Sequence, residues 1–99
     1  MTTASFHRLA AGELRRAHAW YATRDPGVAA RFQQAVDDAV TRICDDPEGQ
    51  AVVLKHFRWV RVRRFPYRLI FEQADENRIL IIAVAHTSRR PRYWRGRKA

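Results

Sequence analysis

Hydrophobic residues in the first half of the chain recur with the spacing of α-helices. Between residues 10 and 23, Leu14, Ala17 and Tyr21 fall on one face at intervals of three and four residues. This spacing predicts a helix over residues 10–23. The preceding residues 5–9, Ser-Phe-His-Arg-Leu, favour a short strand, although five residues of mixed character carry little weight.

A second helix is predicted more clearly after a break in the pattern. Asp25 and Pro26 fit the N-cap and the first position of a helix, because aspartate accepts from free backbone N–H groups and proline lacks one to offer. The apolar stripe that follows consists of Phe32, Val36, Ala39, Val40 and Ile43. Asp-Asp-Pro-Glu-Gly at residues 45–49 predicts the end of this helix, since proline cannot continue it.

The second half of the chain shows the two-residue alternation of β-strands. Three antiparallel strands are predicted over residues 58–65, 67–73 and 78–86, with a polar turn at residues 74–77. Two antiparallel helices packed on one face of these strands give an α+β fold in a single domain, 1–99. Residues 50–57 are not assigned and could form an early strand or a loop.

Alternation also assigns side chains to the two faces of the predicted sheet. In the first strand one face carries Val60 and Val62, and the other carries Trp59, Arg61 and Arg63. In the second strand Tyr67, Leu69 and Phe71 face inward, with Arg68 and Glu72 outside. The third strand is apolar on both faces, with Ile79, Ile81 and Ala83 on one and Leu80, Ile82 and Val84 on the other. Such a strand needs cover on both sides, and the helices supply only one.

Charge changes the picture of the uncovered face. The chain carries 19 Lys and Arg against 10 Asp and Glu, a net charge of +9. Residues 1–50 have a net charge of −1, residues 51–99 have +10, and a basic tail begins at about residue 89. Because arginine outnumbers lysine and is interleaved with Trp and Tyr, this asymmetry favours a polyanion or an acidic protein as partner. A solvated, solubilising face is the alternative.

Several classes of protein are excluded or disfavoured by composition. The single cysteine, Cys44, excludes an internal disulfide and a cysteine-based metal site, and its place on an apolar helical face favours a buried, inert thiol. No cofactor and no metal are expected. The N-terminus lacks the build of a signal peptide, and no apolar run approaches the roughly 18 residues that span a bilayer. A cytoplasmic protein with no membrane partner is therefore expected.

Four stretches, in this order, carry a family resemblance. Glu-Leu-Arg-Arg-Ala-His-Ala-Trp-Tyr-Ala is similar to the opening D/E-L-x-x-I-x-x-Y, and residues 25–47 are similar to the second helix of the same family. RVRRFPYRLIFE resembles the hairpin R-x-(x)-F-P-Y-x-I-x-Y/F, and IIAVAHTSRRP resembles the strand end I-x-x-V-x-H-x-x-R-x-P. The chain thus resembles the RelE/ParE superfamily of toxins from type II toxin–antitoxin modules. The resemblance implies two helices against a mostly antiparallel sheet of about four strands.

The resemblance also implies partners and a function. It implies a hetero-oligomer with a cognate antitoxin, whose acidic segment wraps the toxin and supplies the missing cover. ParE-like members bind DNA gyrase and need no catalytic residue, whereas RelE-like members cut messenger RNA in the ribosome without a metal. Gyrase inhibition is favoured, because His86-Thr-Ser-Arg-Arg-Pro is closer to the ParE branch. A ribosome-dependent mRNA endoribonuclease and a small nonspecific nucleic-acid-binding module are the alternatives.

Candidate site residues follow from these two mechanisms. If the protein is a RelE-like nuclease, the catalytic candidates are Arg61, His86, Arg89 and Tyr93. The candidates for binding the target or the antitoxin are Trp59, Arg61, Arg63, Arg68, Arg89, Arg90, Tyr93 and Trp94. A hydrogen-bonded structural role suits His86 better than a catalytic one, and Tyr93 and Trp94 could instead pin the tail to the sheet. His7, His18 and His56 have no assigned role.

Overall fold

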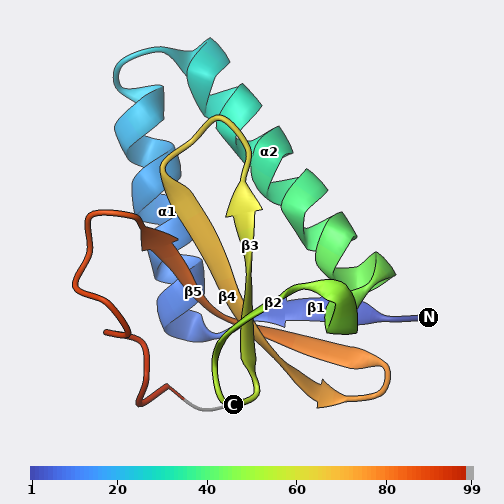
Figure 1. Cartoon of the computed structure of the whole chain (residues 1–99). Helices are drawn as coiled ribbons and strands as arrows, with labels where there is room; N and C mark the ends of the chain where they lie inside the picture. The colour runs from blue at the N-terminus through green and yellow to red at the C-terminus, as the bar shows by residue number, and fades with distance from the viewer. Residues whose placement is uncertain (98–99) are drawn as a thin grey trace.

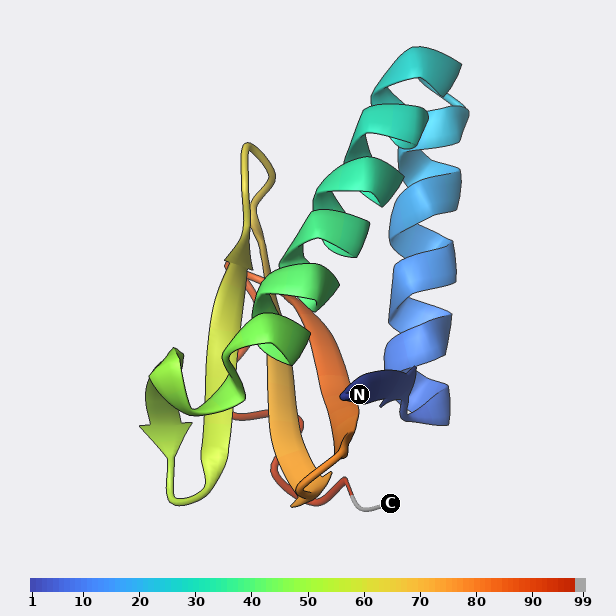
Figure 2. The same cartoon turned by 90° about the vertical axis from the view of Figure 1, so that its right-hand side faces the viewer.

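Two helices lie side by side on one face of a five-stranded sheet in the computed structural model (Figures 1 and 2). The structure describes residues 1–97, so the last two positions of the predicted basic tail, Lys98 and Ala99, lie outside the described residues. The elements in chain order are β1 (Thr3–Phe6), α1 (Arg8–Ala22), α2 (Pro26–Asp45), the short 3-10 helix η1 (Pro47–Gly49), β2 (Ala51–Leu54), β3 (Phe57–Val62), β4 (Tyr67–Asp75) and β5 (Arg78–His86). The predicted α+β class is confirmed.

Local hydrogen bonds define where the helices begin. The Nδ1 atom of His7 accepts from the backbone N–H of Leu9 at 3.1 Å at the start of α1. Asp25 caps α2 as predicted, because its Oδ1 accepts from the N–H of Gly27 at 2.8 Å. Both helices bury their apolar stripes against the sheet. The buried residues of this helix-side core include Ala10, Ala17, Phe32, Val36, Ala39, Ile43, Val60, Val62, Leu69, Phe71, Ile79, Ile81 and Val84.

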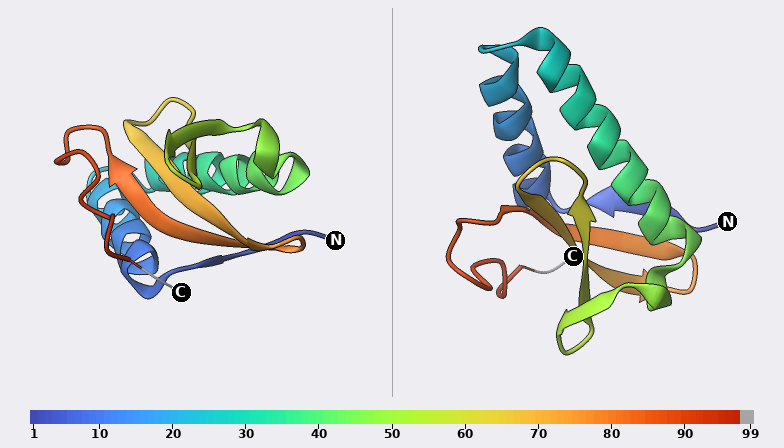
Figure 3. Two further views of the ribbon diagram at one scale, coloured as in Figure 1. Left: turned by 60° about the horizontal axis from the view of Figure 1, so that its bottom comes forward. Right: turned by 45° about the horizontal axis from the view of Figure 1, so that its top comes forward.

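The sheet has five strands in the order β1-β5-β4-β3-β2, one more than the resemblance implied (Figure 3). β1 pairs with β5 in parallel, and all other neighbours are antiparallel. The first strand lies at Thr3–Phe6 rather than at residues 5–9, because α1 already begins at Arg8. Within residues 50–57, which the sequence left unassigned, the chain forms β2, and this strand lies at one edge of the sheet.

A β-bulge in β5 reverses the predicted faces of the last residues of that strand. The pairing register between β4 and β5 shifts by one residue, which leaves Ile82 without a partner on β4. Beyond this point Val84 packs into the helix-side core, whereas Ala83 packs on the opposite face. The predicted faces of Ala83 and Val84 are therefore wrong. His86, two residues after Val84, follows it to the helix side, where its ring contacts Tyr67.

The strand β3 ends at Val62 rather than at residue 65. Residues 63–66 form a turn that joins β3 to β4, and Arg64 in this turn has a positive φ of 71°. Arg63 therefore does not continue the alternation of the strand. Its guanidinium lies near that of Arg42 on α2, so the prediction that Arg63 shares an outer face with Trp59 is wrong.

Candidate interaction site on the outer sheet face

The C-terminal tail, residues 87–97, covers the centre of the sheet face opposite the helices. Trp94 is only 3% exposed, and its ring meets that of Phe57 edge-on with 5.1 Å between centroids. The apolar cluster around Trp94 consists of Phe57, Ile70, Ile82, Ala83 and Ala85. The chain's own tail thus supplies cover that the sequence analysis assigned to an antitoxin, and for this part of the face that prediction is wrong.

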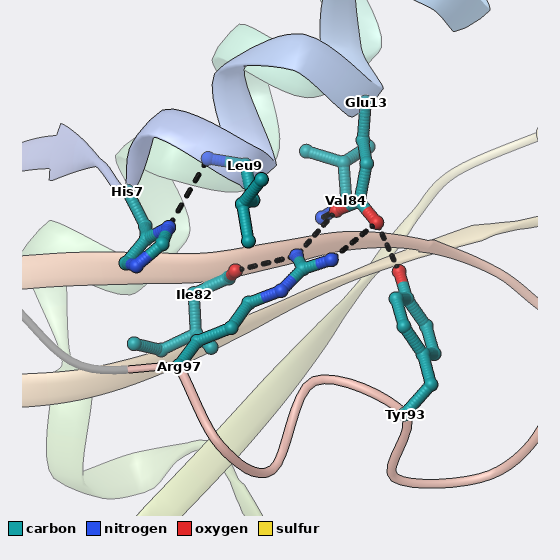
Figure 4. Close-up of polar contacts among 7 residues, drawn as sticks. All are labelled: His7, Leu9, Glu13, Ile82, Val84, Tyr93 and Arg97. Atoms are coloured by element: carbon teal, nitrogen blue, oxygen red, sulfur yellow. Dashed lines mark hydrogen bonds and ion pairs between the residues drawn. The ribbon is translucent and has the colours of Figure 1, made fainter.

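Glu13 on α1 holds the tail in place (Figure 4). Its Oε2 accepts from the Tyr93 hydroxyl at 2.7 Å and from Arg97 Nη2 at 3.0 Å. Its Oε1 accepts from Arg97 Nη1 at 2.8 Å and from the backbone N–H of Val84 at 3.0 Å. Glu13 is 7% exposed, so this ion pair is shielded from water. One carboxylate therefore joins α1, β5 and the tail. This position agrees with the interpretation that Tyr93 and Trp94 pin the tail.

The geometry of the sheet explains why polar groups gather there. β1 pairs with β5 only as far as Ile81, so the backbone groups of β5 beyond that residue have no strand on this side. A buried backbone N–H or C=O needs a partner. Glu13 accepts from the N–H of Val84, and Arg97 Nη1 donates to the carbonyl of Ile82 at 3.0 Å. The pair thus takes the place of a strand along this edge.

These contacts set the protonation of the network. Burial raises the pKa of Glu13, but hydrogen bonds from Arg97, Tyr93 and Val84 outweigh it and leave the pKa below its ordinary value. Burial raises the pKa of Tyr93, and the Glu13 carboxylate raises it further. The pKa of Arg97 is raised by its hydrogen bond to Glu13. Tyr93 is therefore held in its neutral form, and its hydroxyl donates a hydrogen bond to Glu13, which opposes a role as general base.

His86 is engaged in local hydrogen bonds. Its Nδ1 accepts from the backbone N–H of Ser88 at 3.0 Å and lies 2.7 Å from the Ser88 hydroxyl. Its ring meets Tyr67 edge-on at 5.0 Å, on one wall of a cavity of about 440 Å³ between α1 and the end of β5. Arg89 also lines this cavity, together with Trp20, which is 53% exposed. These contacts agree with the hydrogen-bonded structural role expected for His86.

The arginines of the outer face stack on aromatic rings. The Arg68 guanidinium lies over Trp59 at 4.6 Å from the ring centroid, and that of Arg89 lies over Tyr93 at 4.0 Å. Arg61 is directly opposite Arg68 in the register of β3 and β4. Trp59 is partly buried rather than free between arginines. The result is a basic rim around the docked tail.

Most of the candidate residues meet around one small cavity of about 150 Å³. Its lining includes Arg68, His86, Arg89, Arg90, Tyr93 and Trp94. Arg61 and Arg63 do not line it. Of the four catalytic candidates the structure thus brings together three.

Within residues 1–97, no group of three or more His, Cys, Asp or Glu side chains is placed to hold a metal ion. Neither helix in this range is both long and apolar enough to cross a bilayer.

Comparison with known proteins decides the family. A family model described as the ParE toxin of type II toxin–antitoxin system, parDE, matches residues 4–91. This chain belongs to the ParE toxin family. The match covers both helices, β2 to β5 and all of β1 except Thr3, and it ends within the tail, just before Tyr93 and Trp94.

Individual relatives agree with this assignment. The chain is 35% identical over 80 residues to Toxin ParE2 from two strains of Mycobacterium tuberculosis, and the match covers 80% of this chain and 75% of the relative. The solved structure described as Chromosomal ParDE TA system from P. aeruginosa has the same fold, with a TM-score of 0.69 at 19% identity, covering 87% of this chain and 96% of that one. The protein is thus a ParE-like toxin of a type II toxin–antitoxin system, and an antitoxin is its partner.

Sequence reasoning missed two residues that organise this site, Glu13 and Arg97. Glu13 lies four positions before Ala17, within the apolar stripe of the first helix, and an acid in that position signals a buried partner. Arg97 gave no comparable signal, because it is one of several arginines in a tail without periodicity. Its role depends on the path of the tail across the sheet, which only the folded chain shows.

Proposed function

We propose that this ParE-family toxin arrests growth in the cytoplasm by binding and inhibiting DNA gyrase, and that its cognate antitoxin neutralises it. The observation that carries the proposal is the engagement of Tyr93. Its hydroxyl donates to Glu13 at 2.7 Å, and burial beside that carboxylate raises its pKa. A tyrosine held in this way is a poor base for activating a ribose hydroxyl. Binding without catalysis needs no such base.

The basic rim of the outer face is the proposed target surface. Trp59, Arg61 and Arg68 belong to the sheet, and the docked tail adds Arg89 and Arg90; the four arginines are exposed. Arginine and tryptophan are the residues that most often anchor protein interfaces. Tyr93 and Trp94 contribute indirectly in this proposal, by positioning the tail that carries Arg89 and Arg90.

The ribonuclease alternative has one observation in its favour. The cavity of about 150 Å³ brings Arg68, His86, Arg89 and Tyr93 together, and cationic groups beside a histidine suit phosphate chemistry. Against it, His86 Nδ1 already accepts from Ser88, and Tyr93 already donates to Glu13. Tyr93 would have to leave Glu13 before it could act as a base, and His86 would have only Nε2 for proton transfer.

Two parallel assays with the purified toxin separate the mechanisms. We expect inhibition of gyrase supercoiling and no cleavage of ribosome-bound messenger RNA. Loss of inhibition on replacing Arg61 and Arg68 together by glutamine, with retention in the charge-matched Arg8→Gln, Arg15→Gln variant on α1, would agree with the proposed surface. Messenger cleavage that disappears in Arg89→Ala would overturn the proposal. Inhibition that falls steeply with salt and appears with any DNA would favour the nonspecific nucleic-acid-binding module.

A further inference from the structure

A groove on the helix side of the molecule is distinct from the outer face. It lies between α2 and the β3–β4 turn, with a volume of about 470 Å³, and Figure 2 shows this turn standing beside α2. Its lining residues are Arg31, Gln34, Ala35, Asp38, Arg42, Arg63, Arg64 and Phe65. None of the residues assigned above to the gyrase surface lines it.

Positive charge outnumbers negative charge in this groove. Four of the lining residues are arginines and one is an acid. That acid, Asp38, accepts a hydrogen bond from Gln34 at 2.9 Å. The ion pairs found within residues 1–97 lie elsewhere, at His56, Arg78 and Arg97. Within residues 1–97 the arginines of the groove therefore form no close ion pair, and the single carboxylate of Asp38 offsets only part of their charge.

Arg42 shows the imbalance at the level of single atoms. Its Nη2 donates to the carbonyl of Arg61 at 2.7 Å, but its Nε is shielded from solvent and has no hydrogen-bond partner. Burial lowers the pKa of Arg42, the charge of Arg63 lowers it further, and the smaller opposing effect of Asp38 does not restore it. A shielded donor beside a like charge is an unfavourable arrangement in isolation, and an incoming carboxylate relieves both defects.

Other features of the groove indicate which kind of molecule could supply this carboxylate. Its floor includes Ala35 and the ring of Phe65, which packs on Phe32 and Tyr21 with centroids 5.2 Å apart in each case. The exposed face of α2 beside it is acidic. Its exposed carboxylates are Asp37, Asp38 and Asp45, with Asp46 at the cap. A long nucleic-acid backbone would be repelled by this face, whereas a short peptide presents few charges along with apolar side chains.

We infer that this groove, which we call the arginine groove, docks an acidic segment of the antitoxin, with carboxylates on Arg42, Arg63 and Arg64 and an apolar side chain on Phe65. The inference rests on the proposed function, because it takes the antitoxin as the partner. It adds a second contact surface on the helix side. A partner bound there leaves the outer rim and the docked tail in place.

The first test uses a fluorescein-labelled short peptide of glutamate and leucine as probe, with a glutamine-for-glutamate peptide and a short DNA duplex as comparison probes. We expect anisotropy to report binding of the acidic peptide that weakens roughly tenfold, equal to about 1.4 kcal/mol, in the Arg63→Gln, Arg64→Gln variant. That variant leaves the Arg42 contact to β3 intact. The charge-matched Arg8→Gln, Arg15→Gln variant should bind as the wild type does. Equal weakening in both variants, absence of binding, or tighter binding of DNA with the same arginine dependence would overturn the inference.

The second test separates this inference from the gyrase proposal. Cells expressing the Arg63→Gln, Arg64→Gln toxin should arrest as with the wild type but should no longer be rescued by the cognate antitoxin. In vitro the variant should inhibit supercoiling at wild-type concentrations. A variant that is rescued normally, or that loses supercoiling inhibition, would overturn the arginine groove as an antitoxin site. If instead the wild type itself does not inhibit supercoiling, the gyrase proposal fails, whatever the peptide does.

Discussion

At the scale of single residues, Glu13 connects three parts of the fold, α1, β5 and the tail. Its carboxylate accepts four hydrogen bonds, from Tyr93, from Val84 and from both terminal nitrogens of Arg97. A buried carboxylate is costly unless it is paired, and here each partner also needs it. Without Glu13, the backbone N–H of Val84 at the edge of β5 would have no hydrogen-bond acceptor. Removing Glu13 would therefore leave the Val84 N–H, the Tyr93 hydroxyl and the Arg97 guanidinium without their shared acceptor.

Acid should weaken the Glu13 network. The pKa of Glu13 is lower in the folded chain than its ordinary value of 4.5, so the ionised carboxylate stabilises the fold above about pH 4.5. That contribution should be lost as the pH falls through the folded pKa. We expect the free energy of unfolding to fall in this acid range for the wild type and less for Glu13→Gln. Denaturant titrations at several pH values measure it.

The size of the effect at neutral pH has an upper limit. Glu13→Gln should lower the free energy of unfolding by about 3 kcal/mol at most, because the tail can undock locally and return Arg97 to water. Glu48→Gln, at an exposed glutamate in η1, is the matched control and should change little. A difference between wild type and Glu13→Gln that stays constant down to strongly acid pH would contradict the pairing.

The tail is the element whose placement most changes the picture of the site. Trp94 fills an apolar recess on the outer face, and Arg97 then closes the segment against α1. Trp94→Ala should release the tail, because a buried tryptophan contributes roughly 3–5 kcal/mol. Trypsin should then cleave at the tail arginines roughly tenfold faster or more, since cleavage follows the open population.

Trp20→Ala is the control for the tail experiment. Trp20 is 53% exposed, so its loss should leave the cleavage rate of the tail unchanged. Mass spectrometry of the fragments locates the first cuts. Equal rates in wild type and Trp94→Ala would mean that the tail is already open in solution.

The helix α2 offers a test of local sequence signals. Asp25 accepts from the N–H of Gly27 at 2.8 Å, as its position before Pro26 predicted. Asp25→Ala should cost about 1 kcal/mol, the usual loss for an N-cap, in chemical denaturation. Asp37→Ala, within the exposed face of the same helix, should be neutral or slightly stabilising because alanine has the higher helix propensity. Similar losses in both variants would argue against the cap.

For the whole molecule, sequence patterns predicted the layers better than the site. Periodicity and turn residues predicted both helices, the antiparallel hairpins and the apolar strand that is β5 in the structure. The bulge at Ile82 does not, because an apolar strand reads the same with or without an extra residue. It reverses the faces of Ala83 and Val84, and with them the side on which His86 lies. The turn that brings Arg63 toward α2 could not be predicted either, because the arginines at residues 61, 63 and 64 continue the pattern of the strand without a break.

Charge is divided between the faces of the molecule. The basic rim and tail lie on one side of the sheet, and the acidic residues of α2 lie on the other, next to the arginine groove. This division suits a protein that meets two partners, with the proposed gyrase surface on the outer face and the proposed antitoxin groove on the helix side. Tyr93 lies in the first of these regions but has its hydroxyl committed to Glu13.

Supercoiling by purified gyrase in the presence of the Tyr93→Phe toxin tests the central claim most directly. This change removes the one hydroxyl that a RelE-like nuclease would use and only one of the four hydrogen bonds to Glu13, a loss of roughly 1–2 kcal/mol in stability. The account predicts that Tyr93→Phe inhibits supercoiling at wild-type concentrations. The contradicting result has two parts. The wild-type toxin would cleave ribosome-bound messenger RNA, and a folded Tyr93→Phe toxin would have lost both this cleavage and its toxicity.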